Sequence, residues 1–252
     1  MKKSLIALSL AAAFAVPAFA QTAAPAAEAS PHTLTGNVGL FSSYRFRGID
    51  QTFGKPALQG GFDYSHASGF YVGNWNSNVS EYAGFPDGNL EMDFYGGYKL
   101  GLGDVTLDFG GLYYYYPGTT KASNGSKVDN GEVYIGASWK FLSFRYSHAL
   151  TDYFDIANSK NTAYYDVSAN FDLGNGWGVN GHVGYIDVRN NPDLDLTDWK
   201  LGVTKDVGGY VFGLAYVDTN ADRDFYTWTK ASSGKTIYAG KATAVLSVSK
   251  SF

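Results

Sequence analysis

The sequence lacks cysteine and, beyond its first twenty residues, any long apolar run. Without cysteine there is neither a disulfide framework nor a thiolate metal site. A helix that crosses about 30 Å of hydrocarbon needs about 20 apolar residues, and no stretch after Ala20 approaches that length. We therefore expect no transmembrane helix, no disulfide and no thiolate-bound metal.

A strong positive charge is missing as well. The formal net charge is −4, and it becomes −6 without Lys2 and Lys3. Because nucleic-acid binding normally requires a basic patch, this charge argues against a nucleic-acid partner.

Motifs of catalysis are also missing. The sequence contains no P-loop, nucleophile elbow or zincin motif. His66, His148 and His182 fall on separate predicted strands, and in Ser65-His66 and Ser147-His148 the two side chains point to opposite faces of a strand. We predict that the protein is not an enzyme and uses no cofactor.

The first residues have the order of a secretory signal peptide. Lys2 and Lys3 precede an apolar run over residues 5–16, and small residues follow up to Ala20. We predict cleavage near Ala20, a linker over residues 21–33 and one exported domain over residues 34–252.

What the chain does contain is 31 glycines and 17% aromatic residues, with a slightly negative mean hydropathy. Apolar and polar residues alternate with a period of two, as in Leu34, Val38 and Leu40 against Thr35 and Asn37. The pattern predicts about twelve amphipathic strands, over residues 34–47, 58–65, 70–79, 90–100, 105–116, 131–141, 142–151, 163–173, 177–188, 196–205, 210–218 and 237–252. In 70–79 the apolar face stays open between Phe70/Val72 and Tyr71/Trp75.

Short and long connections alternate between these strands. Outer-membrane barrels join their strands by short periplasmic turns and longer external loops. We predict an all-β fold, a transmembrane antiparallel up-and-down barrel with both termini periplasmic. A soluble β-sandwich is the alternative, disfavoured by the signal peptide and by charges in mid-strand. The short connections are 67–69, 101–104, 141/142, 174–176 and 207–209, and the long ones include 80–89, 118–130, 152–161, 189–195 and 219–236.

Aromatic residues lie near both ends of the predicted apolar face, as in the two interfacial girdles of a membrane barrel. The final residue, Phe252, resembles the signal that outer-membrane assembly machinery reads. One predicted girdle contains Tyr44, Phe46, Tyr113, Tyr115, Tyr146 and Tyr185, and the other Tyr64, Tyr98, Phe141, Phe171, Trp177 and Tyr210.

Residues 36–38, 44–52, 56–64, 69–75, 77–79 and 91–98 carry a family resemblance. They are similar to the TorF family, porin-type proteins of proteobacteria of unknown function. Asp50 stands where the family pattern has serine, a departure we place in an external loop. The resemblance implies an outer-membrane, porin-like protein and supplies neither a substrate nor an established site.

If the apolar face meets lipid, the opposite face lines the lumen, where ionisable residues are functional candidates. We predict a narrow channel with weak ion selectivity, in which Arg45 and Arg145 face Glu91 and Asp93 and create a transverse field. Charge pairs that close the lumen are the alternative. The predicted pore-lining residues are Arg45, Asp63, Glu91, Asp93, Lys99, Asp108, Glu132, Lys140, Arg145, Asp166, Asp198, Lys200 and Lys241.

The predicted function is passive diffusion of small hydrophilic solutes through an outer-membrane channel. The expected partners are those solutes, membrane lipids with lipopolysaccharide, and the barrel assembly machinery. The alternatives are a non-conducting structural or adhesive barrel and, less favoured, a barrel enzyme. Acids in the predicted external loops, such as Asp193 and Asp222, are read as solvated turn carboxylates rather than as a metal site.

Overall fold

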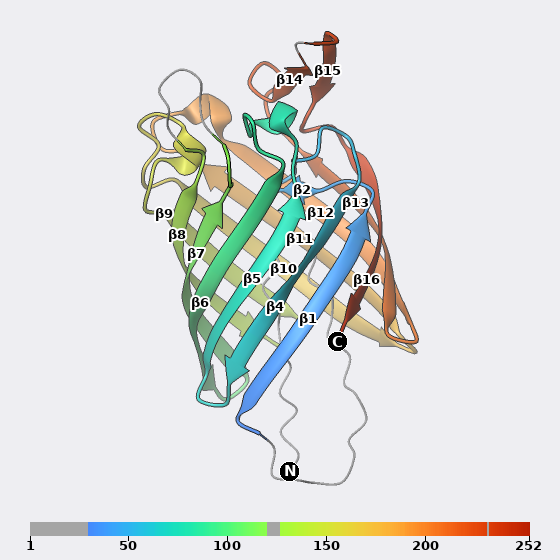
Figure 1. The fold of residues 1–252 in the computed structure, drawn as a ribbon. Coiled ribbons are helices and arrows are strands. Elements are labelled where there is room, and N and C mark those ends of the chain that lie inside the picture. The colour runs from blue at the N-terminus through green and yellow to red at the C-terminus, as the bar shows by residue number, and fades with distance from the viewer. Residues whose placement is uncertain (1–29, 120–126, 231) are drawn as a thin grey trace.

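The computed structural model describes residues 30–119, 127–230 and 232–252. Within them, twelve antiparallel strands close into one barrel (Figure 1). The predicted signal peptide and most of the predicted linker lie outside the described residues. The barrel strands are β1 (His32–Phe41), β4 (Ala57–His66), β5 (Phe70–Asn78), β6 (Leu90–Leu102), β7 (Val105–Tyr115), β8 (Asn130–Trp139), β9 (Leu142–Ala149), β10 (Ala163–Gly174), β11 (Trp177–Asp187), β12 (Leu196–Val207), β13 (Tyr210–Thr219) and β16 (Thr243–Ser251).

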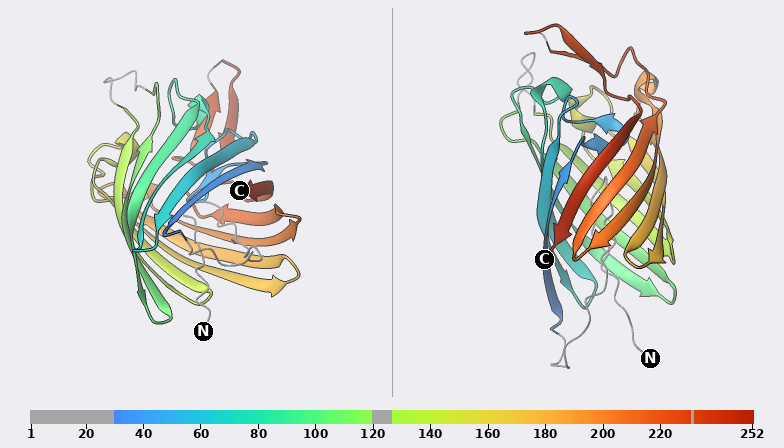
Figure 2. Two further views of the ribbon diagram at one scale, coloured as in Figure 1. Left: turned by 60° about the horizontal axis from the view of Figure 1, so that its bottom comes forward. Right: turned by 90° about the vertical axis from the view of Figure 1, so that its right-hand side faces the viewer.

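The two ends of the barrel differ. Short turns lie at one end, the turn end, with the start of β1 and the C-terminus (Figures 1 and 2). Longer connections lie at the other, the loop end, where the hairpin of β14 and β15 projects beyond the barrel (Figure 1). These connections contain β2 (Arg45–Phe46), β3 (Ile49–Asp50), η1 (Glu81–Ala83), η2 (Tyr153–Asp155), η3 (Pro192–Leu194), β14 (Thr227–Lys230) and β15 (Lys235–Tyr238).

The outer surface of the barrel is apolar, as the alternation predicts. Outward positions leave Leu34, Leu58, Phe62 and Leu201 each about 60% exposed or more. In β5 the outward face is that of Phe70 and Val72. These two side chains are exposed and alternate with Tyr71 and Trp75, which are more buried and face inward. The described residues contain no helix long and apolar enough to span a membrane.

The turn between β8 and β9 accounts for the predicted change of parity. Lys140 and Phe141 form it, and Lys140 has a φ of 54°. A residue in this left-handed region reverses the chain within two positions. The apolar residues of β8 and β9 therefore have opposite parity in the sequence yet face the same side of the sheet.

The first and last predicted strands are too long. Strand β1 ends at Phe41, after which the chain turns into the barrel, and β16 begins only at Thr243. Tyr44 and Phe46 are buried, 1% and 8% exposed, so their predicted place in a lipid-facing girdle is wrong. The cause is that an alternating pattern continues through the tight hairpin of β2 and β3, and the pattern alone does not show where the hairpin leaves the wall.

The barrel closes where β16 meets β1. Residues Asn37 to Phe41 pair with Ser251 to Ser247. Gly36 and Phe252 then exchange two backbone hydrogen bonds of 2.8 and 2.9 Å. Because an ideal Cβ on Gly36 would lie 2.6 Å from the Phe252 ring, only glycine leaves this ring its place on the outer surface. The C-terminal residue thus completes the seam.

Inward tyrosines pack over inward glycines of the neighbouring strands. An ideal Cβ on Gly97 of β6 would lie 2.6 Å from the Tyr71 hydroxyl and 2.3 Å from the Phe109 carbonyl oxygen. Because these glycines have no side chain, the tyrosine rings find room close to the inner wall. The other glycines crossed in this way are Gly73 by Tyr95, Gly110 by Tyr134 and Gly184 by Tyr164.

We predict that Gly97→Val destabilises the barrel, whereas Gly101→Val on the same strand does not. A Cβ on Gly101 meets nothing within 4 Å. Overpacking at position 97 costs about 1–3 kcal/mol, measured as a lower midpoint of urea-induced unfolding from lipid vesicles. Both variants lose the same chain flexibility, so equal shifts would contradict the packing of Tyr71 on Gly97.

Candidate functional site

The connection between β1 and β4, residues 42–56, folds into the barrel rather than away from it. We call this segment the lumen hairpin. Arg45 pairs with Asp50 and Phe46 with Ile49, and all four are less than 9% exposed. A loop facing solvent would not bury two charged side chains in this way.

The local sequence explains the tight shape of the hairpin. Arg47 and Gly48 have φ values of 47° and 80°, the pattern of a two-residue hairpin turn with positive φ at both positions. The Asp50 carboxylate accepts hydrogen bonds from the Thr52 and Gly54 backbone N–H groups at 3.0 and 2.6 Å. This carboxylate fixes the return of the chain toward β4.

The hairpin tip packs against β12 and β13, which lie three and two strands from β1 in the barrel. An ideal Cβ on Gly48 would lie 2.7 Å from the Asp198 Cβ on β12 and 3.0 Å from the Thr219 Cβ on β13. Glycine therefore serves two needs at position 48, a positive φ and a close approach. The hairpin begins at β1 and reaches across to β12 and β13.

Arg47 anchors the tip by a buried ion pair. Its Nη2 lies 2.8 Å from the Glu132 Oε2 of β8, and the two side chains are 7% and 3% exposed. Its Nη1 donates to the Tyr153 hydroxyl at 3.0 Å. The guanidinium also lies 4.3 Å from the centre of the Tyr164 ring of β10, close enough for a cation–π interaction.

The pKa values at this anchor favour a fixed charge. Burial lowers the pKa of Arg47, but the Glu132 carboxylate outweighs it, and the net pKa lies well above its ordinary value. Burial raises the pKa of the Tyr153 hydroxyl to about 12. At neutral pH a charged guanidinium therefore faces a neutral phenol and a carboxylate.

Two further side chains tie the base of the hairpin to the wall. The Tyr44 hydroxyl donates to Glu91 Oε1 on β6 at 2.8 Å. Arg45 Nη1 donates to the Ala239 carbonyl oxygen at 2.7 Å, and its Nη2 donates to Thr243 Oγ1 at 2.9 Å. Together with Arg47, these contacts reach strands on several sides of the lumen.

A hydrophobic core surrounds the hairpin at the loop end. Phe46 packs edge-on against Tyr114 of β7 and Phe154, with ring centres 5.5 and 5.8 Å apart. Tyr44 packs against Trp75 of β5 at 5.4 Å. The loop end of the lumen is therefore filled with packed side chains. Other members of this core are Phe41, Ile49, Ala57, Val79, Phe85, Tyr116, Val188, Leu196, Val217 and Val245.

Below the hairpin, tyrosines and aspartates form a polar belt on the inner wall. Tyr95 donates to Asp63 at 2.5 Å, and Tyr71 donates to Asp108 at 2.6 Å. Arg145 of β9 forms an ion pair with Asp108 at 3.2 Å and lies 4.3 Å from the Tyr134 ring centre. Most acids of this belt are therefore already partnered by the wall itself.

His182 lies between two carboxylates on the next strands. Its Nδ1 is 2.9 Å from Asp166 Oδ2, and its Nε2 is 3.4 Å from Asp198 Oδ2. The Ser168 hydroxyl donates to Asp166 at 2.5 Å rather than to the imidazole. Since both ring nitrogens face acids, His182 is not placed to activate this serine as a nucleophile.

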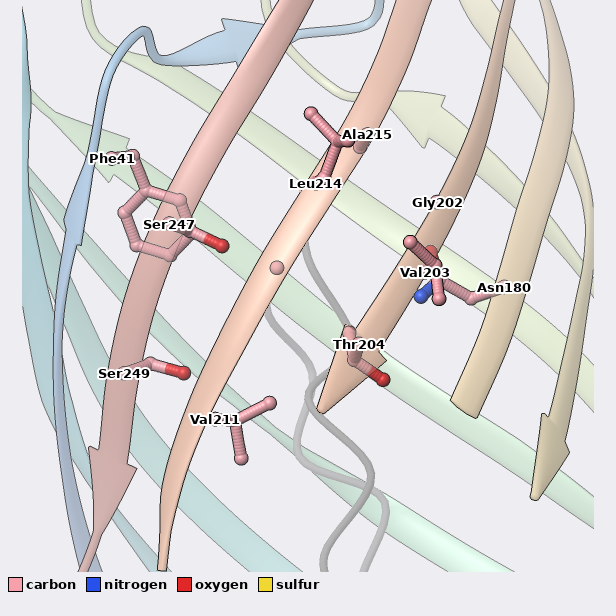
Figure 3. A pocket seen from close by; sticks show the side chains of 11 residues that line it. Phe41, Asn180, Gly202, Val203, Thr204, Val211, Leu214, Ala215, Ser247 and Ser249 are labelled. Atoms are coloured by element: carbon pink, nitrogen blue, oxygen red, sulfur yellow. The ribbon is translucent and has the colours of Figure 1, made fainter. Parts of the chain in front are cut away.

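The inner surface of β13 and β16, with the adjoining parts of β11 and β12, consists of small, uncharged residues and holds a pocket (Figure 3). Gly202 and Thr204 of β12, Val211 of β13 and Asn180 of β11 contribute to its lining. Ser247 and Ser249 of β16 and Phe41 border it on the seam side (Figure 3). A charged, tyrosine-rich surface and a neutral surface of small residues thus lie side by side in the lumen.

Comparison with known protein families shows to which family the chain belongs. Residues 25–252 match the family described as "Bacterial protein of unknown function (Gcw_chp)". The chain belongs to this family. No curated protein matches the sequence.

Solved structures show that this Gcw_chp member has a porin fold. The KdgM porin superposes with a TM-score of 0.55 at 7% identity, covering 86% of this chain and 99% of that one. The KdgM porin in complex with disordered oligogalacturonate gives 0.53 at 7%, covering 87% and 98%. The NanC porin in a rhombohedral crystal form gives 0.50 at 14%, covering 87% and 99%.

Most residues predicted to line the lumen occupy inward positions of the barrel strands. They lie in two groups, the first around the lumen hairpin and the second in the polar belt and its neighbours. The first group is Glu91, Asp93, Glu132 and Asp198, and the second is Asp63, Lys99, Asp108, Arg145, Asp166 and Lys200.

Two predicted lumen lysines lie elsewhere. Lys140 is exposed in the β8–β9 turn, with its Nζ 4.5 Å from the centre of the outward Trp139 ring. Lys241 is exposed in the connection that precedes β16. The prediction is wrong for both, because alternation assigns a face only within a strand.

The predicted transverse field, in which Arg45 and Arg145 face Glu91 and Asp93, is wrong. Arg45 binds Ala239 and Thr243, and Arg145 binds Asp108; neither faces Glu91 or Asp93. Asp50, placed in an external loop, is 2% exposed inside the barrel. Sequence reasoning missed Arg47 as the anchor. The signal for it was the Arg47-Gly48 dipeptide between two short apolar–polar pairs, which reads as a hairpin turn.

We predict that Arg47→Ala releases the lumen hairpin. Removing one partner of a buried ion pair costs about 3–5 kcal/mol because the other charge stays buried and unpaired. The chain has no cysteine, so Ile49→Cys gives a unique buried thiol on the hairpin. Its reaction with a thiol reagent is expected to accelerate roughly a hundredfold when Arg47→Ala is added.

The double variant Arg47→Ala/Glu132→Ala leaves no unpaired charge at this place. Labelling of Ile49→Cys should then return toward the parental rate. If Arg47→Ala alone labels no faster than the parent, the ion pair does not hold the hairpin.

Proposed function

We propose that the protein is an outer-membrane, porin-like channel for passive diffusion of small hydrophilic solutes, and not an enzyme. One observation carries the proposal: a closed barrel with an apolar outer band and a polar interior that is half-exposed toward the turn end. In lipid, closed barrels and helices are the structures that satisfy every backbone hydrogen bond.

The location follows from the same features. The apolar outer band and the fold shared with porins support an outer-membrane barrel, and the signal peptide predicted over residues 1–20 would direct its export. Phe252, at the seam with Gly36, is suited to be the residue that assembly machinery reads. The resemblance to the TorF family is in accord with this function.

The inward charges are the proposed pore-lining residues below and around the hairpin. The polar belt contains both acids and bases, and Arg145 forms an ion pair with Asp108. A wall that carries both signs of charge attracts neither cations nor anions strongly. Weak ion selectivity and uncharged or mixed-charge solutes follow from this arrangement.

The lumen hairpin is the proposed constriction. It fills the loop end together with the core around Phe46 and Tyr114, so solutes pass only when the hairpin shifts. In the closed state Asp93 Oδ1 is buried without a protein hydrogen-bond partner among the described residues. Burying an unpaired acceptor costs free energy, and this cost favours a shift of the hairpin.

The filled loop end also favours a second function, a non-conducting structural barrel. In that case the hairpin would be a permanent part of the core, and the polar belt would only hydrate the turn end. Conductance separates the two functions.

We predict that wild-type protein in a planar bilayer gives small or infrequent conductance steps. A variant in which residues 44–54 are replaced by a short Gly-Ser linker should give larger steps, because the loop end of the lumen opens. The control variant shortens the β14–β15 hairpin, residues 227–238, which projects from the barrel (Figure 1). It should conduct like wild type.

Heat-modifiable migration on gels verifies that each variant is folded. Silence of both wild type and the 44–54 replacement would overturn the channel and support the structural barrel. Large steps from wild type that equal those of the replacement would show that the hairpin is not the constriction.

A further inference from the structure

The aromatic residues at the two ends of the outer surface have polar partners of opposite charge. At the turn end, three outward rings each lie beside a lysine. The Lys140 Nζ lies 4.5 Å from the Trp139 ring centre, and the Lys205 Nζ lies 5.1 Å from the Trp177 ring centre. The third pair is Lys250 over Tyr210, at 4.3 Å.

The strand register holds two of these pairs in place. Trp177 of β11 is directly opposite Lys205 of β12, and Tyr210 of β13 is directly opposite Lys250 of β16. Lys205 also donates to the Asn175 carbonyl oxygen of the adjacent turn at 2.5 Å. The lysines are thus held beside aromatic rings that are 44–48% exposed. We call Lys140, Lys205 and Lys250 the lysine belt, on the β8 to β16 side of the barrel.

Acids of the turn end on this side do not neutralise the belt. By the register of their strands, Asp172 and Asp206 face the lumen. Their carboxylates accept hydrogen bonds from the backbone N–H groups of Gly174 and Gly209 at 2.8 and 2.9 Å. They stabilise turns, and the positive charge of the belt stays on the outer surface.

At the loop end the outward tyrosines bind carboxylates instead. The Tyr113 hydroxyl donates to Asp129 at 3.0 Å, and the Tyr216 hydroxyl donates to Asp218 at 2.9 Å. Tyr185 makes the same contact with Asp195 at 3.4 Å. The two girdles therefore offer different charges to the two leaflets of a membrane.

We propose that the lysine belt binds the head groups of anionic phospholipids in the leaflet at the turn end. Aromatic rings settle at the interface between acyl chains and head groups. Their lysines then stand at the depth of the lipid phosphates, with long side chains that reach toward water. The phosphate of a zwitterionic phospholipid is already paired with the amine of the same head group. An anionic phospholipid lacks this partner and therefore gains more from a lysine at that depth. The proposal rests on the barrel lying in a membrane and is independent of conduction.

The test measures lipid binding to the folded full chain. Detergent-solubilised protein is titrated with phosphatidylglycerol or phosphatidylcholine, and bound lipid is counted by native mass spectrometry. Each lysine near anionic lipid contributes roughly fivefold to binding. The triple variant Lys140→Gln/Lys205→Gln/Lys250→Gln should lose phosphatidylglycerol binding by up to about a hundredfold and keep its phosphatidylcholine binding.

Two matched variants sharpen the test. Lys127→Gln/Lys160→Gln/Lys235→Gln removes the same charge from exposed positions of the loop end and should bind phosphatidylglycerol like wild type. The triple arginine variant of the belt keeps the charge and should also retain binding. Equal loss in the two glutamine variants would show a net-charge effect and overturn the proposal.

Wild-type protein alone also decides the matter if the belt variant does not fold. Phosphatidylglycerol should bind more tightly than phosphatidylcholine, and added salt should reduce the difference because exposed charges are screened. No preference between the two lipids, or a preference that salt does not change, would overturn the proposal.

Discussion

A strand in hydrocarbon can bond its backbone only to another strand, and this constraint governs the whole molecule. No edge can stay open, so the sheet must close. Closure here is made by the pairing of β1 with β16. Phe252 extends this pairing by bonding to Gly36, and its ring lies where a side chain on residue 36 would stand. The same constraint imposes the period of two, because each residue faces either lipid or lumen.

A barrel of this size then has an interior to fill, and this chain fills its two halves differently. Toward the turn end, tyrosines pack over glycines and donate hydrogen bonds to aspartates of the inner wall. Toward the loop end, the lumen hairpin enters and a hydrophobic core forms around it. The Arg47–Glu132 pair joins the hairpin to the far wall. Removing one partner of a buried ion pair is costly because the other charge stays buried and unpaired, so this contact holds the hairpin in one position.

These halves connect the fold to the proposed function. A water-accessible polar lumen suits passage of hydrophilic solutes, whereas a packed core blocks it, so the hairpin decides between the two. KdgM and NanC porins share the barrel at identities of 7% and 14%, and that likeness concerns the fold alone. The outer surface adds a second asymmetry, with lysines among the rings at one end and aspartates at the other. Charge on the girdles thereby distinguishes the two leaflets independently of what the lumen does.

Local patterns were enough to predict the barrel, its strand number, the alternation of turns and loops, and the inward side of residues such as Asp63, Asp108 and Glu132. All of these follow from local alternation and turn composition, which each strand carries within its own residues. The folded structure was needed to place Tyr44, Phe46 and Arg47. It was also needed to show that Arg45 contacts Ala239 instead of Glu91 and that Lys140 lies on the outer surface. Those positions depend on contacts between residues far apart in the chain, and an alternating pattern is the same whether a segment stays in the wall or folds across the lumen.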